Sequence, residues 1–371
     1  MELYYPDSNE ERRLSEKADR ERIPIGGVIE LLPLCNMDCK MCYVRMSKAE
    51  MDRQGKMLSC SEWLQIADNA AKAGTLFLTL TGGEPLLYPE FKTLYAELIQ
   101  RGFILRVNTN GTLIDEEWAD FFAKHGCREL SITLYGADDA TYEKLCGNPE
   151  GFSQVLHAAN LLKSRGVAFR FTCSLTPYNE HQLELLHDIA KRVGVPLSVA
   201  TYMFPAIRRE ISAEKQMRFT PEQAAAATLK NYCLKYPNDS MEMAVKSTAQ
   251  LLRQPPRLRL AGKGFRCHAG HSGYWMNWKG EMTPCGMFAE PRISLKTYGF
   301  EECWAFISDK TMSMPKCKKC LDCPLQNLCN PCPANNYTET GSTGECPEYL
   351  CEKTKALMRL CMEYMKTDTK K

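Results

Sequence analysis

The stretch "LLPLCNMDCKMCYV", residues 31–44, places three cysteines within eight residues. Cys35, Cys39 and Cys42 are spaced Cys-x3-Cys-x2-Cys and follow directly after the β-rich run "GVIELLPL". A structural zinc ion takes four ligands, often from two Cys-x2-Cys pairs, and no fourth cysteine lies nearby. A cubane 4Fe-4S cluster has four irons that each take one outside ligand. Three thiolates would therefore leave one iron for a small molecule.

The composition favours a soluble, reduced protein that binds metal. The chain has 371 residues, 44% of them hydrophobic, and its 47 basic residues nearly balance 45 acidic ones. We expect no nucleic-acid partner, because phosphate binding needs clustered Lys and Arg and no such run is present. We expect no membrane span and a cytoplasmic location, since no long apolar stretch or signal-peptide core is present. The 19 cysteines then indicate metal ligands rather than disulfides.

Short β-rich runs alternate with helix-patterned segments from residue 26 to about residue 205. Examples of the runs are "LFLTL" at 76–80 and "ELSITLY" at 129–135. Strands that alternate with helices form parallel sheets with right-handed crossovers. Six such units predict an α/β fold, a partial (β/α)6 TIM-like barrel. Ligands bind at the carboxyl ends of the strands in such folds, so the residues after each strand are the candidates for a site.

The rest of the chain follows other patterns. The predicted segments are a charged N-terminal extension (1–25), the barrel (26–235), a linker (236–266) and a small Cys-rich domain (267–371). Thr220 is typical of a helix N-cap near the end of the barrel segment. In the last segment, "YWMNWKGEMTPC" predicts a hairpin that turns at Lys279-Gly280, and a closing helix is expected at about 347–366.

The cysteine triplet, with Tyr43 after its third cysteine, resembles the signature of the radical S-adenosylmethionine (SAM) superfamily. In that family the three thiolates hold a 4Fe-4S cluster, and SAM chelates the remaining iron. The reduced cluster cleaves SAM to methionine and a 5′-deoxyadenosyl radical, which abstracts a hydrogen atom from the substrate. On the residues alone, a chance triplet or a zinc site completed from elsewhere are the alternatives.

Motifs at later strand ends support the resemblance. In "TGGEP", Gly82 and Gly83 let the backbone approach a ligand, Glu84 can accept hydrogen bonds from an ammonium, and Pro85 fixes the turn. This is similar to the family's Gly-Gly-Glu-Pro motif, which binds the SAM amino group. The string "NTNGTLI" at 108–114 is similar to one in the peptide-modifying branch. The residues so expected to bind SAM are Tyr43, Gly82, Gly83, Glu84, Pro85, Asn108, Asn110, Ser131, Thr133, Thr172, Ser174 and Arg208.

Tyr135 and Cys146 are the candidates for a catalytic role. Tyr135 shares one face of its strand with Ser131 and Thr133, and that face would look into the barrel. Cys146 stands where related sequences often carry arginine or threonine. It would lie near SAM or the substrate, or be a buried spectator thiol.

The cysteines from residue 267 onward resemble the SPASM extension, a seven-cysteine domain of radical SAM enzymes that mature peptides and proteins. In that extension they hold two auxiliary 4Fe-4S clusters, although the spacing alone would also fit two zinc sites. By the resemblance, the ligands are Cys267, Cys285 and Cys332 for the first cluster, and Cys320, Cys323, Cys329 and Cys351 for the second. No cysteine just before Cys267 offers a fourth ligand, so the first cluster would keep an open iron or recruit Cys317 or Cys346.

The sequence is compatible with three functions. The first is a peptide maturase that forms a thioether or carbon–carbon crosslink in a ribosomally made peptide. Its partners would be reduced flavodoxin or ferredoxin as electron donor and, where the chain does not recognise the peptide itself, a separate leader-peptide-binding protein. The second is oxidation of a protein side chain, as sulfatase maturases do, or modification of a metabolite such as a porphyrin. The third is a zinc-stabilised binding protein without radical chemistry.

Overall fold

The computed structural model describes residues 8–205, 217–235, 267–329 and 331–368, so the predicted linker lies outside the described residues. One nine-stranded sheet forms its centre, in the order β6-β5-β4-β3-β2-β1-β7-β8-β9. The first six strands are β1 (Gly26–Glu30), β2 (Phe77–Thr81), β3 (Ile104–Thr109), β4 (Glu129–Thr133), β5 (Phe169–Ser174) and β6 (Leu197–Ala200). Each pairs in parallel with the next in sequence, which confirms the predicted partial barrel.

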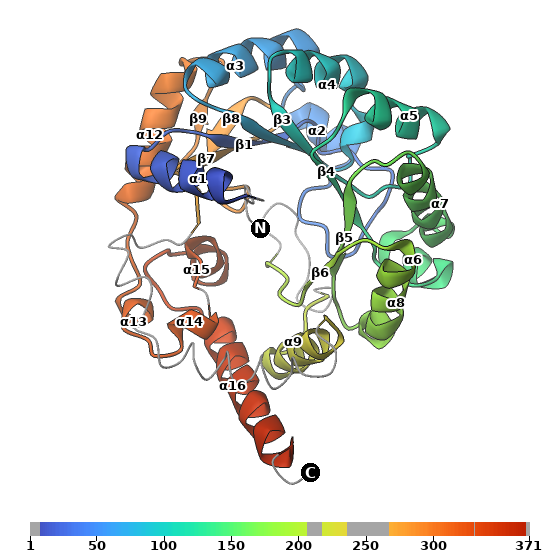
Figure 1. Cartoon of the computed structure of the whole chain (residues 1–371). Helices are drawn as coiled ribbons and strands as arrows, with labels where there is room; N and C mark the ends of the chain where they lie inside the picture. Colours follow the sequence, from blue (N-terminus) through green and yellow to red (C-terminus); the bar gives the residue numbers. More distant parts are fainter. Residues whose placement is uncertain (1–7, 206–216, 236–266, 330, 369–371) are drawn as a thin grey trace.

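Helices cover the convex face of this curved sheet, and its concave face looks toward the centre of the molecule (Figure 1). The helical elements of this half are α2 (Lys48–Gln54), α3 (Cys60–Lys72), η1 (Pro85–Leu87), α4 (Phe91–Gln100), α5 (Glu116–His125), α6 (Asp139–Cys146), α7 (Gly151–Ser164), η2 (Glu180–Gln182) and α8 (Leu183–Val193). Their first turns are fixed locally. Ser59, for example, accepts a hydrogen bond from the Glu62 backbone, and the Glu62 carboxylate accepts one from the Ser59 backbone in a capping box.

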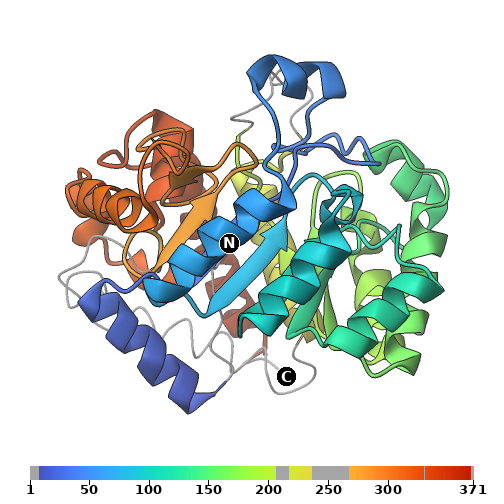
Figure 2. The same ribbon diagram turned by 90° about the horizontal axis from the view of Figure 1, so that it is seen from above.

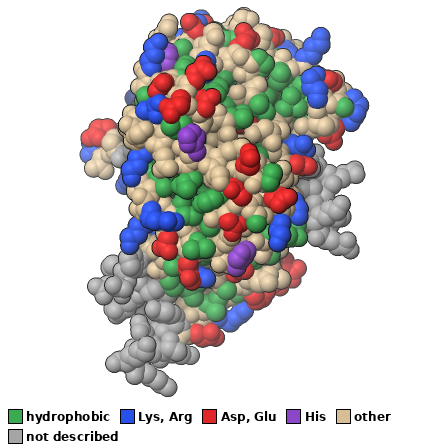
Figure 3. All heavy atoms as spheres, turned by 90° about the vertical axis from the view of Figure 1, so that its right-hand side faces the viewer, with side chains coloured by type: hydrophobic (Ala, Val, Ile, Leu, Met, Phe, Trp, Pro, Cys, Tyr) green, Lys and Arg blue, Asp and Glu red, His purple; other side chains and the backbone are tan. Residues whose placement is uncertain are grey.

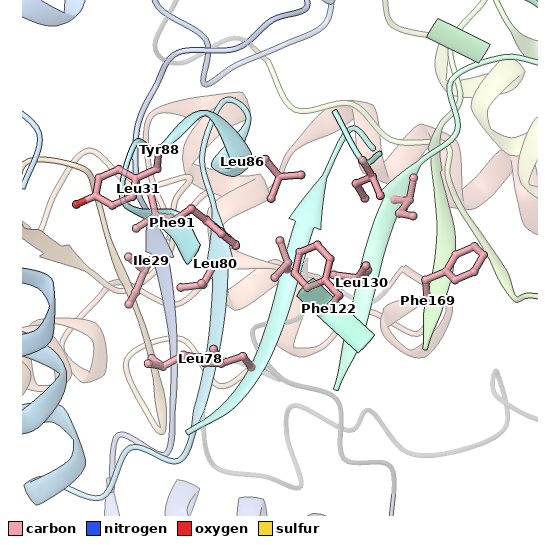
Figure 4. Packing of buried hydrophobic residues seen from close by; sticks show 14 of the residues in the cluster. Ile29, Leu31, Leu78, Leu80, Leu86, Tyr88, Phe91, Phe122, Leu130 and Phe169 are labelled. Atoms are coloured by element: carbon pink, nitrogen blue, oxygen red, sulfur yellow. The ribbon is translucent and has the colours of Figure 1, made fainter. Parts of the chain in front are cut away.

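The main core lies between the sheet and these helices (Figure 4). In β2, Leu78 and Leu80 are buried on the helix side, whereas Thr79 and Thr81 face the barrel interior. Phe122 of α5 is among the fully buried side chains that cover the helix side. Burial of each such side chain stabilises the fold by about 1.5–3 kcal/mol. The helix-facing residues therefore hold the sheet, and the interior-facing ones are left for a ligand.

The predicted N-terminal extension contains a helix, α1 (Asn9–Glu21). Glu11 forms an ion pair of 2.8 Å with Arg128, which lies one residue before β4. Arg22, just after the helix, donates a hydrogen bond of 2.9 Å to the Ser308 hydroxyl. Figure 2 shows α1 and α2 at opposite ends of the strands. The charged segment therefore braces the amino-terminal end of the barrel against the C-terminal third of the chain.

The C-terminal segment continues the same sheet. Strand β7 (Gly273–Met276) pairs in parallel with β1, and β8 (Glu281–Thr283) and β9 (Ile293–Ser294) follow in antiparallel order. The turn between β7 and β8 contains Gly280 at φ +79°, which confirms the predicted hairpin. The segment that begins at residue 267 is thus joined to the barrel by strand pairing rather than by helix packing alone.

Helices follow the hairpin. They are α12 (Phe300–Met312), α13 (Lys318–Leu321), α14 (Gln326–Cys329), α15 (Pro333–Thr340) and α16 (Glu348–Asp368). The last helix begins one residue after the expected position and packs against α9 (Pro221–Lys235) through Ala225, Ala356 and Leu357. Thr220 caps α9 as predicted, because its hydroxyl accepts a hydrogen bond of 3.2 Å from the Gln223 backbone. Helix α16 thereby returns the chain to the β6 side of the barrel (Figure 1).

The face in Figure 3 shows acidic and basic side chains interspersed with apolar ones. Among the described residues, no helix combines the length and apolar character that crossing a membrane requires.

Candidate functional site

A pocket of about 520 Å³ lies against the concave face of the sheet. The parallel strands turn alternate residues toward it, and the loop after β1 closes one side. The predicted site residues that line it are Cys35, Cys39, Cys42, Tyr43, Gly82, Gly83, Asn108, Asn110, Ser131, Thr133, Tyr135, Thr172 and Ser174. Glu84, Pro85 and Cys146 do not line the pocket, and Arg208 lies outside the described residues. Predicted residues on β3, β4 and β5 and in the loops that follow β1, β2 and β3 thus meet at one cavity, as expected for the carboxyl edge of a parallel sheet.

The end of α6 holds the three-cysteine loop in place. The Asp38 backbone donates a hydrogen bond of 2.9 Å to the Cys146 carbonyl, and the Lys40 backbone donates one of 2.9 Å to the Leu145 carbonyl. These carbonyls belong to the last turn of α6 and have no partner within the helix. The loop that carries the thiols is therefore ordered by the fold itself.

Asn110 reaches the same loop from the end of β3. Its amide nitrogen lies 3.6 Å from the Cys35 sulfur and 2.8 Å from the Asn36 side-chain oxygen. Asn36 in turn donates a hydrogen bond of 2.8 Å to the Thr112 hydroxyl. An N–H group directed at a ligating sulfur stabilises the thiolate form and tunes a bound metal group. The predicted cofactor contact is thus placed beside a predicted metal ligand.

The surroundings of Cys35 and Cys39 favour the protonated thiol when no metal is bound. Burial raises the pKa of Cys35 to about 12. Hydrogen bonding to Cys146 and burial together raise the pKa of Cys39 well above its usual range. A metal group that binds here must displace the thiol protons, so binding releases protons.

The family model described as the radical SAM superfamily matches residues 29–205, which carry the three thiols and nearly all of the pocket wall. This chain contains a radical SAM domain. Among curated relatives, PqqA peptide cyclase of Granulibacter bethesdensis is 28% identical over 171 residues, or 46% of this chain and 45% of the cyclase. That match spans less than half of the cyclase. The AdoMet-dependent heme synthase of Nitratidesulfovibrio vulgaris is 22% identical over 327 residues, or 84% of this chain and 88% of the synthase.

Solved structures share the fold beyond the radical SAM domain. Streptococcus suis SuiB bound to S-adenosylmethionine has a TM-score of 0.66 and 19% identity, and the match covers 92% of this chain and 81% of SuiB. SuiB bound to precursor peptide SuiA has a TM-score of 0.66 and 17% identity, with 94% and 84% covered. At these identities the similarity shows the common architecture.

The two glycines of the radical SAM domain's "TGGEP" loop are packed against the chain that leads to the cysteines. A Cβ atom on Gly82 would meet the Leu32 carbonyl oxygen at 2.5 Å, and one on Gly83 would overlap the Leu34 carbonyl oxygen. The backbone of Gly83 donates a hydrogen bond of 2.7 Å to Leu32, and that of Glu84 donates one of 2.8 Å to Leu34. The glycines therefore allow the β2 loop to hold the base of the three-cysteine loop while lining the pocket.

Glu84 differs from its predicted position. Its carboxylate was expected to face the cofactor, but the side chain is fully buried and satisfied within the protein. It accepts hydrogen bonds from the Thr109 hydroxyl at 2.7 Å, the Asn110 backbone at 2.8 Å and the Leu86 backbone at 3.1 Å. Pro85 is buried too and starts the turn η1. Glu84 therefore links the ends of β2 and β3 behind the pocket.

This burial predicts a pH-dependent stability. Desolvation raises the pKa of Glu84 from 4.5 to about 7, so the folded state favours the protonated carboxyl. The stabilisation is complete below pH 4.5 and is lost as the pH rises through 7, at a cost of up to about 3 kcal/mol. We expect the unfolding free energy from urea denaturation to fall between pH 5 and pH 8 in the wild type and to fall less in Glu84→Gln. An equal fall in both proteins would contradict this role.

Tyr135 and Cys146 both interact with Cys39. Tyr135 lines the pocket, and its hydrogen bond to Cys39 favours the thiolate form of that cysteine. Cys146 is completely buried behind Cys39 and does not reach the pocket. This position agrees with the interpretation of Cys146 as a buried thiol that does not contact the substrate. Tyr135, in contrast, can touch a ligand in the pocket.

Three charged residues at the base of the pocket were not predicted. Arg106, Glu129 and Arg170 line it, and Arg170 forms an ion pair of 2.6 Å with Glu129. Each lies two residues before a polar residue that was expected to face the barrel, namely Asn108, Ser131 or Thr172. The period of two along a strand was therefore the signal that could have found them.

A second thiol group adjoins the radical SAM domain. Cys267, Cys285 and Cys332 line a cavity of about 50 Å³ together with Phe204, which also lines the large pocket. Burial, together with the neighbouring thiols Cys332 and Cys285, raises the pKa of Cys267 to about 12. The structure thus brings together the three cysteines assigned to the first auxiliary cluster, and Phe204 stands between them and the main pocket.

Four other C-terminal cysteines form a third group. Cys317, Cys320 and Cys346 have their sulfur atoms within 4.8 Å of one another, and the Cys346 sulfur lies 3.0 Å from that of Cys351. Cys317 also borders a gap of about 10 Å³ that Cys332 lines. Cys346 therefore lies with ligands assigned to the second cluster, not with those of the first.

Proposed function

We propose that this chain cleaves SAM reductively and uses the resulting 5′-deoxyadenosyl radical to crosslink a ribosomally made peptide by a thioether or carbon–carbon bond. The observation that carries the proposal is the convergence of Cys35, Cys39 and Cys42 on one pocket with polar strand ends. A 4Fe-4S cluster held by these thiols would supply the electron that splits the sulfonium. Cys146 is buried away from the pocket, which leaves the pocket side to SAM.

The polar belt of the pocket suits the rest of SAM. Asn108 pairs in register with Ser131, and Thr133 pairs with Thr172, so their side chains form two adjacent polar pairs on β3, β4 and β5. Hydroxyl and amide groups of this kind can bind a ribose or a carboxylate. Gly82 and Gly83 line the same pocket and would lie beside the amino end of SAM. Tyr43 and Phe204 give one wall of the pocket an aromatic lining.

The chemistry requires a donor and an acceptor of single electrons. One electron, supplied by reduced flavodoxin or ferredoxin, releases methionine and the radical. The radical takes a hydrogen atom from the peptide and becomes 5′-deoxyadenosine. Closure of a thioether then releases one proton from the thiol and one electron. Cys267, Cys285 and Cys332 would hold the iron–sulfur group that accepts this electron, and their cavity shares Phe204 with the pocket.

Similarity to two proteins that act on or bind peptides supports a peptide substrate. PqqA peptide cyclase is similar over the radical SAM domain, and SuiB, whose structure includes a precursor peptide, shares the fold along most of the chain. We further propose that the peptide is recognised by this chain itself or by a separate leader-peptide-binding protein.

A tetrapyrrole is the second candidate substrate. The match to AdoMet-dependent heme synthase extends over 84% of this chain, well beyond the radical SAM domain. Arg106 and Arg170 in the pocket are suited to bind carboxylates, which porphyrin precursors carry. The tetrapyrrole and peptide proposals both require cleavage of SAM. They differ in the substrate from which the radical takes the hydrogen atom.

Mass spectrometry separates the two candidates. The anaerobically reconstituted protein is incubated with SAM, dithionite and either a peptide encoded beside its gene or a carboxylated porphyrin precursor. We expect the peptide to lose the mass of two hydrogen atoms, with 5′-deoxyadenosine formed in step. Arg106→Gln should impair turnover of the porphyrin precursor if that is the true substrate. Decarboxylation of the precursor with an unchanged peptide would refute peptide crosslinking and retain the radical mechanism.

A further inference from the structure

The C-terminal segment has more thiols than a second cubane cluster needs. Besides the four cysteines assigned by the resemblance, Cys317 and Cys346 lie in the same group. Of all His, Cys, Asp and Glu side chains in the described ranges, only Cys317, Cys320 and Cys346 bring three potential ligand atoms within 4.8 Å of one another. The SAM-site thiols Cys35, Cys39 and Cys42 are not gathered this tightly.

The sulfur distances distinguish one ion from a cluster. Cys320 and Cys346 are 3.6 Å apart at sulfur, and Cys346 and Cys351 are 3.0 Å apart. Four thiolates around one tetrahedral zinc ion, with bonds of about 2.3 Å, lie about 3.8 Å from one another. In a cubane each thiolate binds its own iron, which spreads the sulfurs more widely. The spacing of Cys317, Cys320 and Cys346 therefore suits a single ion, and Cys351, which is close to Cys346 but outside this group, is the fourth thiol within reach.

The chain spacing leads to the same four residues. Cys317-x2-Cys320 and Cys346-x4-Cys351 are two pairs with the separations of a structural zinc site. The first pair lies at α13, where the Cys320 backbone donates a hydrogen bond of 3.1 Å to the Cys317 carbonyl. The second pair enters α16, where Cys351 donates one of 3.2 Å to Pro347.

The surrounding structure holds the two pairs together. The Thr343 hydroxyl donates a hydrogen bond of 2.8 Å to the Pro315 carbonyl, which fixes the loop before Cys346 to the loop before Cys317. This contact holds the two cysteine pairs close to each other.

We propose that Cys317, Cys320, Cys346 and Cys351 bind one Zn²⁺, which connects α13 to the start of α16. Binding releases four thiol protons and changes no oxidation state. This site replaces the second auxiliary cluster, because Cys320 and Cys351 cannot serve both. Cys323 and Cys329 are then thiols outside the zinc site. The proposal concerns a structural ion and does not depend on the substrate of the radical SAM domain.

Metal analysis of the anaerobically purified full chain tests the site. We expect one zinc per chain and iron for two cubane clusters. Cys317→Ser and Cys346→Ser should lose the zinc and keep the iron and sulfide, whereas Cys323→Ser and Cys329→Ser, as matched controls, should keep both metals. A wild type without zinc and with iron for three clusters overturns the proposal, as does loss of iron from Cys346→Ser.

X-ray absorption at the zinc edge of the wild type makes the test independent of whether the variants fold. We expect four sulfur ligands at about 2.3 Å. Nitrogen or oxygen ligands in place of two or more sulfurs would show a zinc bound elsewhere and would refute the assignment.

Discussion

Replacement of Cys39 by alanine is expected to abolish the formation of 5′-deoxyadenosine from SAM. The thiol lines the pocket between Cys35 and Cys42, and the backbone on either side of it is hydrogen-bonded to the end of α6. Loss of one of three ligands should prevent stable binding of a cubane, so iron and sulfide should fall by one cluster per chain. Product is measured by chromatography after reduction with dithionite, and metal is measured on the same sample.

Cys60→Ala is the matched control for this variant. Cys60 is also a buried cysteine, but it lies in the first turn of α3 outside the pocket. It should keep the full iron content and SAM cleavage. If Cys39→Ala cleaved SAM at the rate of the control, the three-cysteine loop would not be the site of the radical chemistry.

Gly83→Ala is expected to have the second largest effect. The new methyl group would overlap the Leu34 carbonyl oxygen, which is backbone and cannot rotate away. The β2 loop must then move away from the base of the three-cysteine loop and lose its hydrogen bond to Leu32. Overpacking of this kind costs about 3 kcal/mol. We expect a lower unfolding free energy and SAM affinity weakened by at least about tenfold, measured by urea denaturation and by equilibrium binding.

Gly299→Ala provides the comparison. A Cβ atom at Gly299 meets no heavy atom within 4 Å, and its φ of −67° is accessible to alanine. This variant should match the wild type in stability and in SAM binding. A Gly83→Ala protein as stable as Gly299→Ala would mean that the loop has room for a side chain, contrary to the packing described above.

The barrel and its interior face were predictable because they follow local periodicity. Ser131 and Thr133, like Thr172 and Ser174, alternate along their strands and all line the pocket. The same rule extends to Arg170, which was missed because only residues near the strand ends were considered.

Contacts between distant segments could not be read from the sequence. Glu84 was expected to face the cofactor, but its partners Thr109 and Asn110 come from the next strand. Likewise, the segment that begins "YWMN" predicted a hairpin, but not that its first strand, β7, pairs with β1. A pattern within one segment predicts which face is polar, but it does not show which segment lies opposite.

The place of β1 in the sheet has a consequence for synthesis. Strand β1 pairs with β2 on one edge and with β7 on the other. Because β7 lies late in the sequence, Gly26 can pair with Gly273 only after most of the chain has left the ribosome. The nascent barrel therefore carries an open strand edge beside its three thiols, and such edges invite pairing with other chains. In the folded protein β7 covers this edge, and the Trp275 indole of β7 donates a hydrogen bond of 3.2 Å to the buried Glu30 of β1. Completion of the C-terminal third thus protects the growing protein from aggregation as well as supplying its further thiols.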